Sequence, residues 1–215
     1  LVGYGLDGGL APWLCVPAQA VSRGNIIPVA TEIPATRLAL AEPLSCVLNG
    51  HRRHGGVNPG ETVVIIGGGA IGLLHTALNL ACGAGRVILC EKHADRRDRA
   101  AAMGAVTTCP EHLSEVVTEH TGGYGAELVI VAIGRNELTE ESLNLAAPGG
   151  RVSWFAGFPK GSTTTITPNT VHYQELTISG GSNASRADVH RAVDMLGRGN
   201  IDETPIVTHT FGLSQ

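Results

Sequence analysis

The 215-residue chain is poor in aromatic residues, which make up 4% of it, and in charged residues, which make up 16%. A net charge of −4 gives no broad attraction for nucleic acid or for an anionic lipid surface. No apolar stretch approaches the roughly 20 residues that span a bilayer, and the N-terminus lacks the basic and apolar segments of a secretion signal. We therefore expect a globular cytoplasmic protein without nucleic-acid or membrane partners.

Paired cysteines are also missing. The five cysteines are scattered and form no C-x-x-C pair, which excludes a disulfide framework and a self-contained zinc knuckle. We expect reduced thiols at Cys15, Cys46, Cys82, Cys90 and Cys109.

Glycine, by contrast, is abundant, and three of the 29 glycines carry the strongest signal. The β-branched run Thr62–Ile66 ends abruptly at Gly67, and an apolar helical pattern starts directly after Gly69. Gly67, Gly69 and Gly72 occupy the positions of a G-x-G-x-x-G turn between a strand and a helix. Such a turn brings backbone N–H groups and the positive end of a helix dipole to a pyrophosphate. The sequence therefore predicts a dinucleotide-phosphate site formed by Gly67, Gly68, Gly69, Ala70, Ile71 and Gly72.

A second strand pattern supports this interpretation. Arg86–Cys90 follows the helical segment and ends at Glu91, nineteen residues after Gly72. This is close to the spacing of the acid that binds an adenosine ribose in dinucleotide-binding βαβ units. The alternative is an ordinary βαβ unit with a glycine-rich turn, which we consider less favoured.

Strand and helix patterns alternate along the middle of the chain, which predicts parallel pairing with right-handed crossovers. We expect an α/β fold of the Rossmann type, a doubly wound sheet of six parallel strands in the order 3-2-1-4-5-6. The expected strands are Thr62–Ile66, Arg86–Cys90, Val106–Thr108, Leu128–Ala132, Arg151–Phe155 and Leu176–Ser179.

The two ends of the chain differ from this middle part. Residues 1–42 are rich in Gly, Pro and Ala, and Trp13–Val16 and Asn25–Val29 predict short strands of a β-rich element. Near the other end, Ser185 and Asp188 match a capping box that starts a helix. We expect a further short strand at Ile206–His209.

Other candidate chemistry is weaker. His51 and His54 have the i, i+3 spacing of a chelating pair, but the arginines between them favour a solvated helix end. No Ser-His-Asp set stands out and no G-x-S-x-G elbow is present. Glu42, followed by Pro43, can cap a helix or ligate a metal, and the residues alone favour the cap.

Several motifs together resemble the zinc-type medium-chain dehydrogenases, particularly the branch of sorbitol (polyol) and threonine dehydrogenases. The similarity runs in order over essentially the whole chain. It rests on Gly8–Ala11 with Val16 and Pro17, Glu42–Cys46, Asn58–Val63, Thr121–Ala126, Pro148–Val152, and Thr208 with His209.

The resemblance implies a division into three parts. Residues 1–42 would belong to a partial GroES-like catalytic domain, 43–180 to an NAD-binding Rossmann domain, and 181–215 to a segment returning to the catalytic domain. Family members carry further zinc ligands upstream that this sequence does not contain, so we expect a fragment of a longer enzyme. A homodimer or homotetramer is expected.

The resemblance also assigns residues. It makes Glu42 a ligand of the catalytic zinc or its close neighbour, which reverses the preference for the cap. Glu91 would receive the ribose hydroxyls, and Arg96 would assist at the adenosine end. The nicotinamide would be bordered by Ala132, Ile133, Gly134, Ala156, Gly157 and Phe158.

The implied activity is that of a zinc-dependent alcohol or polyol dehydrogenase. NAD would oxidise a secondary alcohol, polyol or sugar-derived, to a ketone, with zinc as the Lewis acid. One alternative is a zinc-free medium-chain reductase that uses NADPH, against which Glu91 argues because an acid there repels a 2′-phosphate. The other is a catalytically incomplete NAD-binding module.

Overall fold

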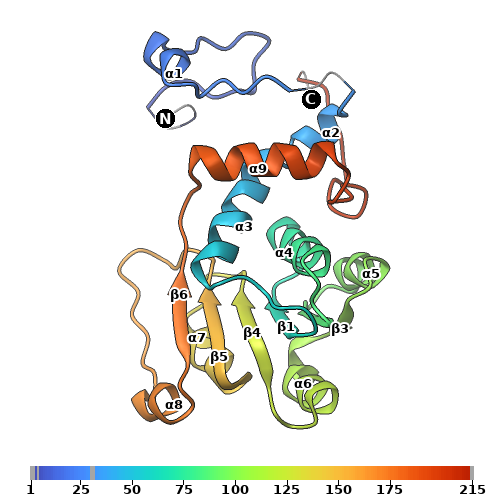
Figure 1. Ribbon diagram of the computed structural model, residues 1–215, viewed down its shortest axis with the longest axis vertical. Helices are drawn as coiled ribbons and strands as arrows, with labels where there is room; N and C mark the ends of the chain where they lie inside the picture. The colour runs from blue at the N-terminus through green and yellow to red at the C-terminus, as the bar shows by residue number, and fades with distance from the viewer. Residues whose placement is uncertain (1–2, 4, 30–31, 214–215) are drawn as a thin grey trace.

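A computed structural model describes residues 3, 5–29 and 32–213. Its centre is a sheet of six strands in the order β3-β2-β1-β4-β5-β6, with all neighbours parallel (Figure 1). This confirms the predicted fold class and strand order. The strands are β1 Thr62–Ile66, β2 Arg86–Cys90, β3 Val106–Thr108, β4 Ala126–Val131, β5 Ala146–Trp154 and β6 Thr177–Gly180.

Helices cover both faces of the sheet (Figure 1). They are α1 Ala18–Ser22, α2 Ala35–Leu38, α3 Ala41–Arg53, α4 Ala70–Ala81, α5 Ala94–Ala102, α6 Leu113–Thr121, α7 Glu137–Asn144, α8 Pro168–Tyr173 and α9 Arg186–Gly197, with a 3-10 turn, η1, at Pro110–His112. Within the described ranges, every helix is too short or too polar to reach across a bilayer.

The strands are almost continuously apolar because both faces of the sheet are buried. Alternate residues of β1 point to opposite faces, so Ile65 packs in one apolar cluster and Val64 in another. The first cluster includes residues of α3, α4, α5 and α9, and the second includes residues of α6 and α7. The central strand β1 is thereby fixed between two cores, which holds the turn at its carboxyl end in place.

The edges of some elements differ from the sequence prediction. Helix α7 ends at Asn144, and β5 begins at Ala146, earlier than the strand expected at Arg151–Phe155. Pro148–Gly150 lies within β5, where the register against β4 shifts between Ala126 and Leu128. The irregularity accommodates Gly149, whose φ of +73° is unfavourable for other residues.

The three short strands predicted near the chain ends were wrong. In residues 5–29 and 32–42 the structure contains no β-strand, and the Trp13–Val16 and Asn25–Val29 segments are irregular. Of the expected strand Ile206–His209, Ile206 ends a turn and the rest is irregular, and the N–H groups of Ile206 and Val207 both donate to the carbonyl of Glu203. Without a neighbouring strand in the described chain, these short apolar runs have no partner for a ladder.

The predicted boundaries at residues 42 and 180 remain predictions. Helix α3 starts at Ala41, so the first boundary falls inside a helix, and the second coincides with the end of β6 at Gly180.

Candidate functional site

The glycine turn joins β1 to α4 as the sequence predicts. Gly67 has a φ of +112°, and a Cβ there would lie 2.5 Å from Cγ1 of Ile133. At Gly72, a Cβ would lie 1.7 Å from the carbonyl oxygen of Gly67, so helix and strand approach too closely for any side chain. The first and third glycines of the motif are therefore required by the geometry of this chain.

The second motif glycine faces open space. Gly69 caps α4 in an extended conformation, and a Cβ there would meet nothing within 4 Å. The first N–H groups of a helix have no acceptor within the helix, and the helix dipole makes this end positive. An anionic group can therefore approach Gly69, Ala70 and Ile71 from outside the protein.

Glu91, at the end of β2, turns its carboxylate toward this loop. One carboxylate oxygen accepts the N–H of Gly68 at 2.9 Å, and the other accepts the N–H of His93 at 3.0 Å. The guanidinium of Arg96 lies 3.6 Å from the same carboxylate. Burial disfavours the charged form of Glu91, but these N–H groups and Arg96 outweigh it and lower the pKa of the carboxyl group.

Glu91 therefore supports the glycine turn, a role that the sequence did not reveal. The pattern located an acid at the correct strand end, but it could not show that the acid also fixes the Gly68 amide.

A cavity of about 330 Å³ lies beside Glu91, at the carboxyl ends of β1 and β2. Three predicted cofactor residues, Glu91, Arg96 and Ile133, line it together. Its size is at the low end of the range for small-molecule sites. The remaining lining residues combine apolar and charged side chains, Ile66, Cys90, Lys92, Pro110, Leu113, Arg135, Glu137, Leu138 and Glu141.

The loops after β4 and β5 meet on the other side of the glycine turn. A Cβ on Gly134 would lie 2.0 Å from the carbonyl oxygen of Gly157 and 3.5 Å from Cα of Phe158. The N–H of Ala132 donates to the carbonyl of Ile66, the last residue of β1. The structure thus brings the predicted nicotinamide residues of the two loops into contact.

A second cavity of about 660 Å³ opens at the carboxyl ends of β5 and β6 and borders α3. Ala156 and Gly157, two of the predicted nicotinamide residues, line it. The other lining residues are Cys46, Arg53, Trp154, Phe155, Gly180, Gly181, Ser182 and Asn183. Five of the predicted cofactor residues therefore line two cavities at the carboxyl ends of the strands, three in the first and two in the second.

The metal prediction has less support in the geometry. Glu42 is exposed in the first turn of α3, and its carboxylate accepts a hydrogen bond from the thiol of Cys46 at 3.4 Å. Burial and then the charge of Glu42 raise the pKa of Cys46 to about 11, which keeps the thiol protonated. Throughout residues 3, 5–29 and 32–213, no group of three or more His, Cys, Asp or Glu side chains is placed to hold a metal. The described residues do not provide the three protein ligands of a catalytic zinc.

His51 and His54 do not form a solvated helix end, which corrects the prediction. His54 is only 3% exposed, and the two rings lie edge to face with centroids 5.3 Å apart. Neither ring nitrogen of His54 has a hydrogen-bond partner in the described chain.

The fully buried His75 was missed. It lies on α4, with its ring edge to face against Phe155 at 4.5 Å. The sequence signal for its burial is its position among the leucines of α4, because a histidine within an apolar helix is expected in the core.

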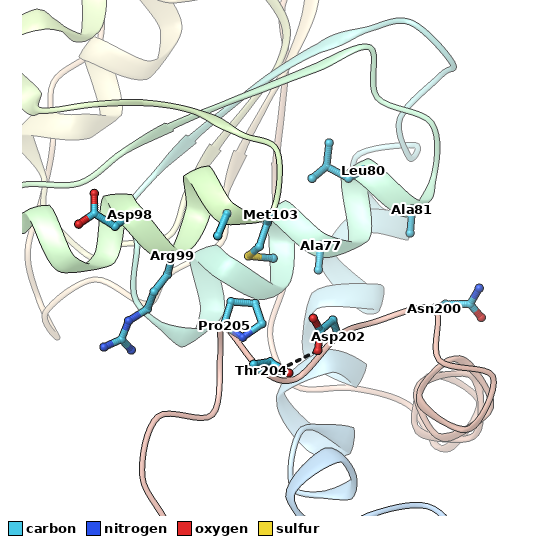
Figure 2. Close-up of a pocket in the computed structure, with 11 residues that line it drawn as sticks. Ala77, Leu80, Ala81, Asp98, Arg99, Met103, Asn200, Asp202, Thr204 and Pro205 are labelled. Carbon is cyan, nitrogen blue, oxygen red and sulfur yellow. Dashed lines mark hydrogen bonds between the residues drawn. The ribbon is translucent and has the colours of Figure 1, made fainter.

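A further cavity, of about 680 Å³, lies between α4, α5 and the segment that follows α9 (Figure 2). Met103 and Pro205 belong to its apolar part, and Asp98, Arg99 and Asp202 are its charged residues. None of the predicted cofactor or metal residues lines it, so it is separate from the sheet-edge site.

Comparisons with known proteins agree with this geometry. The chain is 31% identical over 211 residues to an uncharacterised zinc-type alcohol dehydrogenase-like protein of Haemophilus influenzae. That match covers 97% of this chain and 59% of the relative. An L-threonine 3-dehydrogenase of Bacillus licheniformis is 30% identical, over 100% of this chain and 61% of the relative. The chain thus spans about three fifths of these relatives.

A solved structure shows the same fold. It is a putative zinc-binding dehydrogenase from Sinorhizobium meliloti, bound to NADP, with 31% identity and a TM-score of 0.84. The match covers 94% of this chain and 58% of that one. Residues 70–198 match the family model described as zinc-binding dehydrogenase. By this match over more than half of its length, the chain belongs to the zinc-binding dehydrogenase family.

Proposed function

We propose that the protein takes part in the NAD-dependent oxidation of a secondary alcohol, polyol or sugar-derived, to a ketone. The observation that carries the proposal is Glu91, held at the end of β2 beside the N-terminus of α4. A carboxylate there can accept hydrogen bonds from both ribose hydroxyls of an adenosine. Family membership and the L-threonine 3-dehydrogenase relative support a hydroxyl-bearing substrate.

The chain's residues would bind the cofactor in three parts. The amides at Gly69, Ala70 and Ile71 would hold the pyrophosphate, and the 330 Å³ cavity beside Glu91 would take the adenosine. The loops around Gly134 and Gly157 would border the nicotinamide, with Ala132, Ile133, Ala156 and Phe158. When bound, NAD supplies the acceptor for the hydride that leaves the alcohol carbon, while the hydroxyl proton is released.

Zinc enters the proposal only through Glu42. The described residues lack the three protein ligands that a catalytic zinc needs, so Glu42 would need further ligands from outside them. Glu42 remains the predicted contribution of α3 to a zinc site in the whole protein.

An NADPH-dependent reductase without zinc is the second candidate. The S. meliloti structure contains NADP, and the cations Lys92 and Arg96 line the cavity beside Glu91. Both could face a 2′-phosphate, whereas Glu91 would repel it.

The ratio of cofactor affinities tests the proposal. Charge-assisted hydrogen bonds contribute roughly 1.5–3 kcal/mol each, so NAD should bind at least about tenfold more tightly than NADP. The measurement is calorimetric titration of both cofactors. Glu91→Ser should weaken NAD and narrow the gap.

Because Glu91 also holds the Gly68 amide, Glu91→Gln is the matched control. Its amide oxygen can still accept from Gly68 while the charge is lost. If the charge sets the preference, Glu91→Gln narrows the NAD-to-NADP ratio as Glu91→Ser does. Equal affinities in the unmodified protein, or a preference for NADP, would contradict the proposal and favour the reductase.

A further inference from the structure

The lining of the 660 Å³ cavity beside the predicted nicotinamide residues holds one formal charge, and the nearest carboxylate on α3, that of Glu42, bonds to the thiol of Cys46 in the same lining. Of the residues that line it, Arg53 is the one with a formal charge, and no Asp or Glu is among them. The nearest acid along α9, Asp188, is buried and already engaged. Its carboxylate accepts from the N–H and hydroxyl of Ser185 and pairs with Arg52 at 3.6 Å.

Arg53 and its neighbour Arg52 have different roles. Arg52 donates to the side-chain oxygen of Asn49 at 2.7 Å in addition to pairing with Asp188. The guanidinium of Arg53 has no hydrogen bond or ion pair with any residue that the structure describes, and the residue is exposed. Its guanidinium can therefore bind a ligand without first breaking an internal contact.

The part of the cavity wall formed by Gly180–Asn183 is held against α3. The side-chain amide of Asn49 donates to the carbonyls of Ser182 at 3.3 Å and of Asn183 at 2.9 Å. A Cβ on Gly181 would come within 3.3 Å of Cα of Gly50, so the wall packs directly on the helix. The cavity that Arg53 lines is thus bounded by a preformed polar wall.

We propose that Arg53 binds a carboxylate on the substrate, so that the alcohol oxidised is a polyhydroxy acid rather than a neutral polyol. The inference rests on the proposed function, because Ala156 and Gly157, which line this cavity, are two of the residues predicted to border the nicotinamide. Arg presents paired N–H donors that match the two oxygens of a carboxylate. The glycine turn does not line this cavity, which separates Arg53 from the proposed pyrophosphate site.

The test compares two ligands that differ in one group. Gluconate and sorbitol share a polyol chain, and gluconate has a carboxylate where sorbitol has a CH2OH. Both are titrated by calorimetry into the protein, with and without saturating NAD. The variants are Arg53→Gln and Arg53→Lys. The matched control is Arg191→Gln, which removes one positive charge from an exposed position on α9.

We expect gluconate to bind about tenfold more tightly than sorbitol, with Arg53→Gln abolishing that difference and leaving sorbitol unchanged. Arg53→Lys should restore part of the difference, and Arg191→Gln should not alter it. Equal weakening of both ligands by Arg53→Gln would overturn the proposal. So would a tenfold loss of NAD affinity, which would assign Arg53 to the cofactor, or Arg53-dependent binding of inorganic phosphate but not gluconate.

Failure of the proposed function gives a different result. If the protein does not bind NAD, the cofactor titration shows no binding. The titration of gluconate without cofactor still measures how far the affinity for gluconate depends on Arg53.

Discussion

Two buried histidines link the stability of the protein to pH. His54 on α3 and His75 on α4 are 3% and 0% exposed, and none of their ring nitrogens has a partner in the described chain. Burial lowers the pKa of His54 to about 4 and that of His75 to about 3. The charges of His51 and Arg151 add to the effect at His54. Both rings are therefore neutral in the folded protein at pH 7.

The sign of the pH dependence follows from these values. Below the ordinary histidine pKa of about 6.5, the unfolded chain takes up protons that the folded protein does not, so unfolding becomes more favourable. Each buried histidine should lower the free energy of unfolding by up to about 1.4 kcal/mol per pH unit. The loss for His75 begins near pH 6.5 and continues to about pH 3. Urea unfolding at pH 7, 6 and 5 measures it.

A pair of variants isolates the contribution of His75. His75→Leu removes the buried ring, so its slope between pH 6 and 5 should be smaller than that of the unmodified protein by about 1.4 kcal/mol per unit. His190→Leu, at an exposed position on α9, should keep the original slope. The carboxylates titrate in both variants, so they do not contribute to the difference between them. Identical pH slopes of the free energy of unfolding in His75→Leu and His190→Leu would show that His75 is protonated in the folded state.

At the scale of single elements, the start of α9 offers a second test. Ser185 accepts the N–H of Asp188 at 3.2 Å, and the Asp188 carboxylate accepts the N–H of Ser185 at 2.9 Å. This capping box was predicted from sequence and is confirmed. Ser185→Ala should lower the free energy of unfolding by about 1–2 kcal/mol, because both the helix N–H and the buried Asp188 lose a partner.

Ser185→Gly is the control for that prediction. Glycine usually costs only a few tenths of a kcal/mol at a helix cap. Chemical unfolding of both variants at pH 7 measures the difference. If Ala and Gly proved equal to Ser, the hydroxyl would contribute nothing to α9.

The sequence was most informative where local and tertiary preferences agree. The aliphatic run Thr62–Ile66 lies between two cores and pairs with β2 on one side and β4 on the other, so its local preference and its tertiary setting both favour a strand. Trp13–Val16 has the same local pattern, but in the described chain it pairs with no strand, and it remains irregular. A strand depends on its neighbour, which no local pattern reveals.

The site shows the same limit. Turn geometry at Gly67 and Gly72 is dictated by backbone, so the motif located it correctly. The backbone does not dictate the direction of a side chain in the same way. The hydrogen bond from the Gly68 N–H to the Glu91 carboxylate is therefore visible only in the structure. Likewise, nothing in the order Arg52-Arg53 indicates that one arginine is paired and the other is not.

At the scale of the whole molecule, the chain consists of a compact sheet-and-helix body and an N-terminal segment outside it. Figure 1 shows α1 and its flanking loops beyond α9, away from the sheet. No side chain in residues 5–29 is buried, and Leu10 and Trp13 are 95% and 91% exposed. A hydrogen bond from the guanidinium of Arg186 to the carbonyl of Arg23 joins the segment to α9.

Such a segment should be cut by protease without unfolding of the body. Chymotrypsin should cleave first near Trp13 and Leu14, since backbone outside the packed core is the preferred site of proteolysis. Removing residues 1–29 should change the free energy of unfolding by about 1 kcal/mol or less, because no apolar side chain in residues 5–29 is fully buried. Mass spectrometry of the first product and chemical unfolding of the shortened chain measure the two effects.

Fluorescence gives an independent control, because the chain contains two tryptophans. In Trp154→Phe, the remaining Trp13 should emit as in water and be quenched by acrylamide, whereas in Trp13→Phe the half-buried Trp154 should be protected. A blue-shifted, protected Trp13 would mean that the segment packs against a surface in solution. In that case its removal should destabilise the body by the apolar area that it covers, at roughly 25 cal/mol per Å².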